Sequence, residues 1–315
     1  MSVSVGILFP GQGSQTVGMG ADLFDARDDL LGARADEILG FSLRNVCLDG
    51  PEEVLTRTEH AQPALFALSY ALWEMAGGLD SLRPEGAAGH SLGEYTALAA
   101  AGVFDFDSGL ALVAERGRAM GRAASLEESG MAALLGADRD TAEKACHARR
   151  EVGGRLQVAN VNAPGQVVVA GGKDDLAWLV DNAGDMGIRR VVPLNVAGAF
   201  HSSFMEPAQA DLSAAVEKIR LEDPAFPVWS NATAQPHRPD QVGDSLIRQL
   251  VNPVLFSDSL LDMASAGIHT FVHIGPGDVT AGLARRTVEG ATVITISTID
   301  DIRSAQEALV SIDRP

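Results

Sequence analysis

The sequence contains little cysteine and few aromatic residues, and it has no long hydrophobic run. Of its 315 residues, 2 are cysteines and 5% are aromatic. Cys47 and Cys146 lie far apart without the spacing of metal ligands, so we expect reduced thiols in a cytoplasmic protein. No apolar run reaches the roughly 18 residues that a membrane span needs. The first residues, MSVSVGILFPGQG, show neither a basic region nor a cleavage site, which argues against a signal peptide.

Basic residues are scarce, and lysine is the scarcest of them. The chain has 42 acidic and 24 basic residues, a formal charge of −18, and only three lysines, at 144, 173 and 218. This balance excludes a globally basic nucleic-acid binder. An acidic or phosphate-bearing partner would have to meet a local group of arginines, for which the pairs at 189–190 and 285–286 are candidates.

The residues that are abundant indicate a layered α/β protein. Hydrophobic residues make up 46% of the chain, and there are 33 glycines. The apolar run at 4–9 predicts a buried strand, and the glycine-rich loop PGQGSQ follows it. Helices are predicted at 62–76, with Pro63 at the first helical position, at 92–101 and at 104–120. The later elements are a helix from about 205, a strand at 226–230, a helix near 258–266, strands at 269–274 and 292–297, and a final helix.

The middle of the chain has a different pattern. From about 131 to 193 the predicted elements follow the order β-α-β-β-α-β, which is the ferredoxin-like order. We therefore predict a small ferredoxin-like subdomain at 127–196, inserted into a large subdomain formed by 1–126 and 197–315. The large subdomain is expected to be an α/β-hydrolase-like core with a parallel sheet.

A serine between two glycines is the first candidate for chemistry. The stretch AAGHSLGEYTALAA, residues 87–100, contains the pattern G-x-S-x-G around Ser91. This pattern places a serine on a tight strand-to-helix turn, where the N-terminal N–H groups of the helix favour a developing oxyanion. The alternative is a plain glycine turn that is capped by Ser91.

A nucleophilic serine needs a base, and His201 is the best candidate. It lies in VAGAFHSSFM, a loop of small residues between a predicted strand and helix. The adjacent His90 should point away from Ser91 across the turn. His147 and His237 are interpreted as surface residues. The alternative for His201 itself is a buried histidine with satisfied hydrogen bonds.

The oxyanion needs two donors from different loops. The backbone N–H of Leu92 directly follows the serine, and PGQGSQ offers a second N–H through Gln12. The same loop could be read as a dinucleotide-binding fingerprint, but that pattern requires glycine where Thr16 stands.

Eight short motifs occur in a fixed order along the chain. They are FPGQGSQ, QPALFAL, GHSLGEYTAL, ERGRAM, NVNAPGQVVVAGG, AFHSSFM, QLVNPV and IGPG. Together they resemble the malonyl-CoA:acyl-carrier-protein transacylase family and the acyltransferase domains of polyketide synthases, from about residue 5 to residue 285. Any one motif is weak, whereas eight in order are very specific.

The resemblance implies roles for the catalytic residues. Ser91 matches the nucleophile and His201 the general base, while Gln12 and Leu92 match the oxyanion-hole donors. Gln249, in QLVNPV, matches a residue whose main-chain carbonyl orients the histidine, so no aspartate completes a triad. A neutral carbonyl can still select the tautomer of the imidazole.

The resemblance also implies how the substrate is recognised. Arg116, in ERGRAM, matches an arginine that binds the free carboxylate of malonyl, which a guanidinium can hold with two hydrogen bonds. The alternative is a solvated helix arginine beside Arg118 and Arg122. Phe200 resembles a bulky residue that leaves little room for an α-methyl branch, and Leu92 agrees with this preference for malonyl over methylmalonyl.

The remaining candidates are weaker. Asn160 and Asn162, together with His90, are candidates for contacts with the substrate's thioester or pantetheine amides, although the asparagines could equally cap strand ends. His60 and Gln62 are assigned to local packing. The sequence departs from the family pattern at several positions, which include His273 and Asp278.

The resemblance therefore implies transfer of malonyl from malonyl-CoA to the phosphopantetheine thiol of an acyl carrier protein, through a malonyl-serine intermediate and without a metal or redox cofactor. Alternatives for the pathway are a trans-acting polyketide acyltransferase and a malonyltransferase subunit of a malonate decarboxylase. Two less favoured alternatives are a thioester hydrolase and a non-catalytic carrier-protein binding module.

Overall fold

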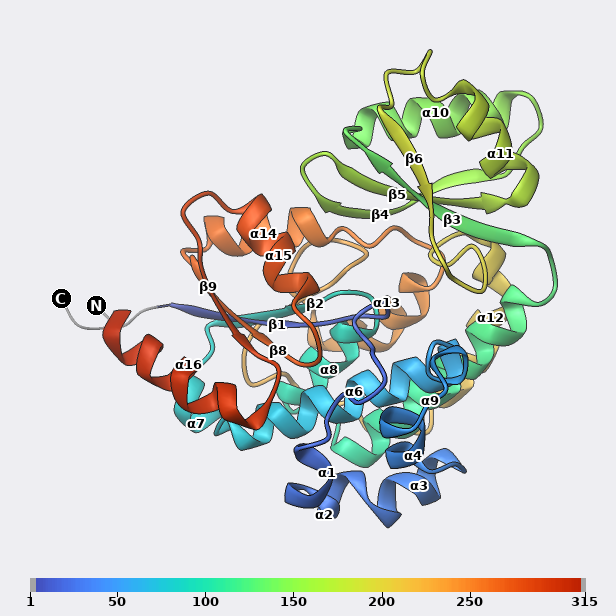
Figure 1. The fold of residues 1–315 in the computed structure, drawn as a ribbon. Helices are drawn as coiled ribbons and strands as arrows, with labels where there is room; N and C mark the ends of the chain where they lie inside the picture. Colours follow the sequence, from blue (N-terminus) through green and yellow to red (C-terminus); the bar gives the residue numbers. More distant parts are fainter. Residues whose placement is uncertain (1–3, 313–315) are drawn as a thin grey trace.

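Two β-sheets of different kinds organise the chain (Figure 1). The computed structural model describes residues 4–312, so the ends of the predicted large subdomain at 1–3 and 313–315 lie outside the described part. A parallel sheet is surrounded by most of the helices, and an antiparallel sheet with its own helices lies beside it, at the top right of Figure 1. Within 4–312, no helix combines the length and the apolar character that crossing a membrane requires.

The parallel sheet has five strands in the order β7-β2-β1-β8-β9. The strands are β1 (Val5–Phe9), β2 (Gly86–Gly89), β7 (Val228–Trp229), β8 (Thr270–Ile274) and β9 (Thr292–Ile296). β1, β2 and β8 are buried along their whole length, as expected for parallel strands that helices cover on both faces. The strands predicted from the sequence at 4–9, 226–230, 269–274 and 292–297 are confirmed, with slightly different ends.

The helices around this sheet include two long ones, α6 and α9, that pack against each other. The helices are α1 (Leu23–Ala26), α2 (Asp28–Leu31), α3 (Ala33–Leu39), α4 (Leu43–Leu48), α5 (Glu52–Leu55), α6 (Thr58–Met75), α7 (Gly78–Leu82), α8 (Leu92–Ala100), α9 (Phe106–Ala124), α12 (Glu206–Val216), α13 (Val242–Gln249), α14 (Phe256–Ser265), α15 (Val279–Thr287) and α16 (Ile299–Ile312), with short 3₁₀ turns at Ser203–Met205 and Pro239–Gln241. α9 begins after Asp105, whose side chain accepts a hydrogen bond from the N–H of Ser108 at 2.8 Å and caps the helix.

The predicted start of α6 is wrong. The sequence pattern puts Pro63 at the first helical position, but the helix begins at Thr58 and contains Pro63. The proline lacks the N–H that would bond to the carbonyl of Glu59, which costs the helix one hydrogen bond. The additional first turn forms because Thr58 and Ala61 are buried against the rest of the fold, and this tertiary packing outweighs the local signal.

The antiparallel sheet confirms the β-α-β-β-α-β order of the middle segment. It has the strand order β4-β5-β3-β6. Its elements are β3 (Ser129–Leu135), α10 (Arg139–Glu151), β4 (Leu156–Ala163), β5 (Gln166–Gly172), α11 (Lys173–Asn182) and β6 (Arg190–Pro193). These elements enclose a separate hydrophobic core that contains Leu134, Leu156, Val169 and Leu179.

The two sheets are joined along β4. Asn160 forms an isolated parallel bridge with Val254, which precedes α14. The N–H of Val161 donates to the carbonyl of Val254 at 2.8 Å, and the N–H of Val254 donates to the carbonyl of Ala159 at 2.8 Å. This contact holds one edge of the antiparallel sheet near the carboxyl ends of the parallel strands, where α/β proteins place their ligands.

Candidate active site

Ser91 lies at the turn between β2 and α8. Its φ of 51° and ψ of −100° belong to a region that residues other than glycine rarely adopt. The strand and the helix approach so closely that a Cβ on Gly89 would collide with the backbone of Gly93, which explains the glycine at 89. Asn231, after β7, accepts a hydrogen bond from the N–H of Ser91 at 2.7 Å and donates to the carbonyl of Gly89 at 2.7 Å. The strained turn is therefore held from the neighbouring strand.

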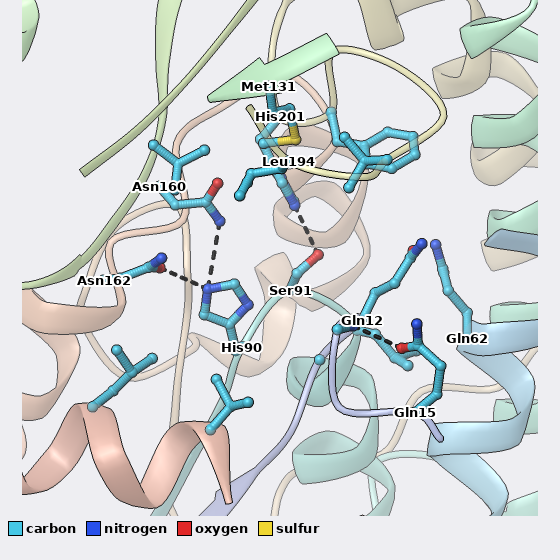
Figure 2. Close-up of a pocket in the computed structure, with 18 of the residues that line it drawn as sticks. Gln12, Gln15, Gln62, His90, Ser91, Met131, Asn160, Asn162, Leu194 and His201 are labelled. Atoms are coloured by element: carbon cyan, nitrogen blue, oxygen red, sulfur yellow. Dashed lines mark hydrogen bonds between the residues drawn. The ribbon is translucent and has the colours of Figure 1, made fainter. Parts of the chain in front are cut away.

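The side chains of Ser91 and His201 meet in the structure, as Figure 2 shows. The Oγ of Ser91 lies 2.7 Å from Nε2 of His201, and Nδ1 of His201 lies 2.9 Å from the main-chain carbonyl of Gln249. Because a carbonyl only accepts, Nδ1 carries a proton and the neutral ring presents a lone pair at Nε2 to the serine hydroxyl. Burial lowers the pKa of His201 to about 3, and the nearby charge of Arg116 acts in the same direction. The imidazole is thus neutral at pH 7.

Arg116, on α9, is buried beneath the serine with only 1% of its surface exposed. Nη2 donates to Oγ of Ser91 at 3.0 Å and to Oε1 of Gln249 at 2.8 Å. Nη1 donates to Oε1 of Gln62 at 2.6 Å, and the guanidinium lies 5.0 Å from the centre of the Tyr95 ring. Among residues 4–312, no acidic side chain forms an ion pair with this arginine.

The alternative interpretation of Arg116 as a solvated helix arginine is wrong. Its neighbours Arg118 and Arg122 do lie toward the solvent, where both pair with Glu115. The same stretch of α9 therefore carries two surface arginines and a buried one, because residues 116 and 118 face different sides of the helix. A buried guanidinium without an acidic partner is a candidate for binding an anionic group.

The two expected oxyanion donors line the same cavity as Ser91. Leu92 is the first residue of α8, and Gln12 lies in the loop after β1. The loop approaches the turn so closely that a Cβ on Gly11 would collide with the carbonyl of His90. Within the described residues, the main-chain N–H groups of Gln12 and Leu92 have no hydrogen-bond acceptor, so both donors are free for a ligand.

The cavity has a volume of about 380 Å³ and lies between the two sheets. The parallel-sheet part contributes the serine turn, the Gln12 loop, Arg116 and, on α15, the apolar residues Val279 and Leu283. Strands of the antiparallel sheet and the segment after β6 contribute the opposite side. Phe200, which is 6% exposed, and His201 are neighbours in this lining.

His90, Asn160 and Asn162 form one group in the cavity wall (Figure 2). Nε2 of His90 lies 2.8 Å from Oδ1 of Asn162 and 3.4 Å from Nδ2 of Asn160. The ring of His90 is thus engaged with the asparagines, and no hydrogen bond to Ser91 is formed. Both asparagines lie within β4, so they do not cap strand ends, and that alternative is wrong.

Several buried polar residues carry contacts that the sequence pattern does not indicate. Gln62, assigned to local packing, accepts a hydrogen bond from Arg116 instead. His237, interpreted as a surface residue, has a fully buried side chain whose Nε2 lies 2.6 Å from Oε1 of Glu94. The surface interpretation is wrong because the side chain is buried against Glu94 of α8, a contact between residues that lie far apart in the sequence. Asn231 had no signal beyond the turn-like segment in which it lies.

Comparison with known proteins places this site in a family. Residues 7–310, nearly the whole chain, match the acyl transferase domain family. The chain belongs to the acyl transferase domain family. This acyltransferase is 37% identical over 309 residues to the malonyl CoA-acyl carrier protein transacylase of Bacillus subtilis, covering 97% of both chains. It is 36% identical over 304 residues to the protein of the same name from Staphylococcus aureus, covering 96% of this chain and 98% of the other.

Solved structures give the same relationship. The malonyl CoA-acyl carrier protein transacylase of Coxiella burnetii superimposes on the acyltransferase with a TM-score of 0.92 at 31% identity, covering 98% of both chains. A malonyl-transacylase in complex with its type II polyketide synthase acyl carrier protein superimposes with a TM-score of 0.91 at 35% identity, covering 97% of this chain and 99% of the other.

Of the two arginine pairs considered for an acidic partner, at 189–190 and 285–286, one member lines the cavity. Arg286, on α15, lines it, whereas Arg285, Arg189 and Arg190 are exposed outside it. His273 is buried away from the cavity, where its ring contacts Oγ1 of Thr280 at 2.6 Å. The cavity is thus lined by the buried Arg116 and by the exposed Arg286 on α15.

Proposed function

We propose that this acyltransferase moves a malonyl group from malonyl-CoA to the phosphopantetheine thiol of an acyl carrier protein. The observation that carries the proposal is the meeting of the Ser91 hydroxyl, a neutral His201 and a buried Arg116 in one cavity. Full-length relatives named malonyl CoA-acyl carrier protein transacylase support the same substrates. The structure of a relative in complex with an acyl carrier protein supports the proposed partner.

The first half of the reaction forms an ester. His201 accepts the proton of Ser91 at Nε2 as Oγ attacks the thioester carbonyl of malonyl-CoA. The oxyanion receives hydrogen bonds from the N–H groups of Gln12 and Leu92. The carbon–sulfur bond then breaks, His201 returns its proton to the sulfur, and CoA leaves a malonyl-serine ester.

The second half reverses these steps with a different thiol. The pantetheine thiol of the carrier protein gives its proton to His201 and attacks the ester carbonyl. The serine oxygen leaves and recovers the proton, so the enzyme returns to its starting state with ping-pong kinetics. The tautomer that the Gln249 carbonyl selects serves both halves, because it keeps the lone pair at Nε2 directed at Ser91. These steps use no metal or redox cofactor.

Substrate choice follows from the polar and apolar sides of the cavity. The guanidinium of Arg116 would bind the free carboxylate of malonyl, which acetyl lacks. Phe200 would limit space beside the α-carbon, and Asn160, Asn162 and His90 would contact the thioester or pantetheine amides. Arg286, on α15, suits the phosphates of CoA or of the carrier's prosthetic group.

We also propose to which known folds the two sheets belong. The strand order β4-β5-β3-β6 with helices between β3 and β4 and between β5 and β6 fits a ferredoxin-like subdomain at 127–196. The parallel sheet with its serine turn fits an α/β-hydrolase-like core. The buried and unpaired Cys47 and Cys146 agree with a cytoplasmic location, which stays a prediction.

Intact-protein mass spectrometry after mixing with malonyl-CoA tests the function. We expect one malonyl adduct on the native protein and none on Ser91→Ala. Addition of a carrier protein with its phosphopantetheine should remove the adduct and load the carrier, whereas the carrier without that group should not. A native protein that forms no adduct, or an adduct that persists in Ser91→Ala, would contradict the proposal. Release of free malonate at equal rates with and without the carrier would indicate a hydrolase.

A further inference from the structure

Below the cavity lies a buried carboxylate for which the proposed reaction has no use. Glu94, on α8, has no exposed surface. Its Oε1 lies 2.6 Å from Nε2 of His237, and its Oε2 accepts hydrogen bonds from the N–H of Asn231 at 3.1 Å and from Nε2 of Gln249 at 2.6 Å. Every oxygen of this carboxylate is thus engaged by a residue from a distant segment.

The geometry indicates a negative charge on this group. Nδ1 of His237 is buried and has no hydrogen-bond partner in the described residues. A protonated imidazole would leave a buried N–H unpaired at Nδ1, whereas a neutral ring that donates from Nε2 leaves only a lone pair. Two N–H donors on Oε2 also suit an ionised carboxylate. With a neutral imidazole beside it, the carboxylate of Glu94 keeps its negative charge.

Glu94 determines which way the amide of Gln249 faces. A carboxylate only accepts, so the NH₂ group must be the end that faces Glu94, where it also donates to the carbonyl of Ser91 at 2.9 Å. Oε1 of Gln249 must then face the other side, where it accepts from Nη2 of Arg116 at 2.8 Å. With its main-chain carbonyl on His201, this single glutamine contacts all three proposed catalytic and binding residues.

The side-chain amide of Gln249 lies between two buried charges, the guanidinium of Arg116 and the carboxylate of Glu94. A buried guanidinium without any compensating charge is costly. Burial lowers the pKa of Arg116, whereas Tyr95 and, to a smaller extent, the charge of Glu94 raise it. A direct ion pair would remove that cost, but it would also occupy the N–H groups that a substrate carboxylate needs. With an amide between them, the two charges still attract each other, but no carboxylate contacts the guanidinium. Nε of Arg116 has no hydrogen-bond partner within residues 4–312, so it can still donate to a ligand.

We propose that Glu94, held by His237, is a positioning residue for carboxylate selection: it supplies the counter-charge of Arg116 from one amide away and fixes Gln249 between them. The negative charge must lie at position 94 and the amide at position 249. The inference rests on the proposed function in one respect, namely that the carboxylate selected by Arg116 is that of malonyl.

An exchange of the two side chains tests this requirement. The double variant Glu94→Gln/Gln249→Glu keeps an acid and an amide in contact, but it places the carboxylate against Arg116. We expect a folded protein that still loads acetyl, with a malonyl-to-acetyl ratio of kcat/KM for serine loading at least tenfold below the native ratio. A native ratio in the exchanged protein would overturn the proposal. A lowered ratio also includes the direct effect of a carboxylate at position 249 on Arg116, and the double-mutant cycle below isolates the part that belongs to Glu94.

A control shows whether loss of a buried carboxylate is enough. Asp175, on α11, is likewise buried and accepts a hydrogen bond from Arg149 at 2.7 Å, and neither residue lines the cavity. Asp175→Asn should lower stability and leave the malonyl-to-acetyl ratio within twofold of the native value. If Asp175→Asn lowers the ratio as much as the exchange does, the effect is general destabilisation and the proposal fails.

A second measurement does not depend on malonyl at all. Glu94→Gln and Arg116→Met are combined in a double-mutant cycle on the equilibrium constant of unfolding in urea. If the charge of Glu94 compensates that of Arg116, Glu94→Gln should raise the equilibrium constant of unfolding at least tenfold more in the native protein than in the Arg116→Met variant. Equal effects in both backgrounds would overturn the proposal. Absence of a malonyl adduct on the native protein would instead contradict the proposed function and leave this cycle interpretable.

Discussion

The parallel-sheet part and the antiparallel-sheet part meet the same cavity with different kinds of side chains. The first presents Ser91, His201 and Arg116, which are buried, strained or hydrogen-bonded to one another. The second presents neutral amides on β4 and apolar side chains such as Met131 and Val168. Reactive groups need fixed geometry and a controlled charge, which a buried polar network supplies.

The backbone shows the same contrast. Ser91 and His201 both adopt positive φ, at 51° and 57°, whereas Asn160 and Asn162 lie within a strand. Strained backbone persists only where surrounding contacts hold it, and at Ser91 the side chains of Asn231 and Gln249 bind the main chain. Under the proposed function, the side with Ser91 and His201 would carry out proton and acyl transfer, and the side with β4 would contact the remainder of the substrate.

The largest expected effect belongs to the proposed base. His201→Ala should lower the rate of serine loading from malonyl-CoA by about 10⁴-fold, because the hydroxyl then has no proton acceptor. Rapid-quench mass spectrometry measures this rate, and circular dichroism checks the fold. A variant that loads at more than a tenth of the native rate would remove the contrast between the two sides.

The second-largest effect on activity is expected for Arg116. Arg116→Ala removes the proposed partner of the substrate carboxylate, and such a loss at a buried site costs about 3–5 kcal/mol, or at least 100-fold in kcat/KM for malonyl-CoA. Acetyl-CoA should gain relative to malonyl-CoA. Competition between the two substrates gives the ratio directly, and an unchanged ratio would exclude Arg116 from this role.

The asparagines should matter less. Asn162→Ala removes one hydrogen bond to His90, and a bond of this kind contributes about 0.5–1.5 kcal/mol, so we expect roughly a 2- to 10-fold increase in KM with kcat nearly unchanged. Steady-state kinetics with malonyl-CoA separates the two constants. If kcat fell as far as it does in His201→Ala, the antiparallel side would share the chemistry and the contrast would disappear.

The last prediction concerns stability in mild acid, where no effect on activity at neutral pH is expected. Burial lowers the pKa of His201 to about 3 and that of His273 to about 4, both below the ordinary value of 6.5. The unfolded chain therefore binds more protons than the folded one below pH 6.5, and the free energy of unfolding should decrease as the pH falls from 6.5 to 5. Each group contributes at most about 1.4 kcal/mol per pH unit.

Urea denaturation at several pH values measures this slope. His273→Gln, remote from the cavity lining, should make the slope shallower by removing one of the contributing groups. A slope that His273→Gln leaves unchanged would show that His273 is not a source of the acid sensitivity.

Much of the fold could be predicted from the sequence because local patterns of apolar and polar residues indicate the type of each element. The run at 4–9 is apolar in most positions and became a buried strand, and the β-α-β-β-α-β order of the middle segment is as predicted. The start of α6 could not be predicted from Pro63, because burial of Thr58 extended the helix. Local signals determine the type of an element, whereas packing determines where it ends.

By itself, the sequence determined the strand–serine–helix turn at Ser91 and, through eight ordered motifs, the resemblance to acyltransferases. Only the tertiary structure decided that Arg116 is buried without an acidic partner, that His237 is enclosed, and that Glu94 and Gln249 lie between them. The physical reason is that burial and charge compensation depend on which distant segments pack together. No spacing along the chain encodes those contacts, because residues 94, 116, 237 and 249 lie on separate elements.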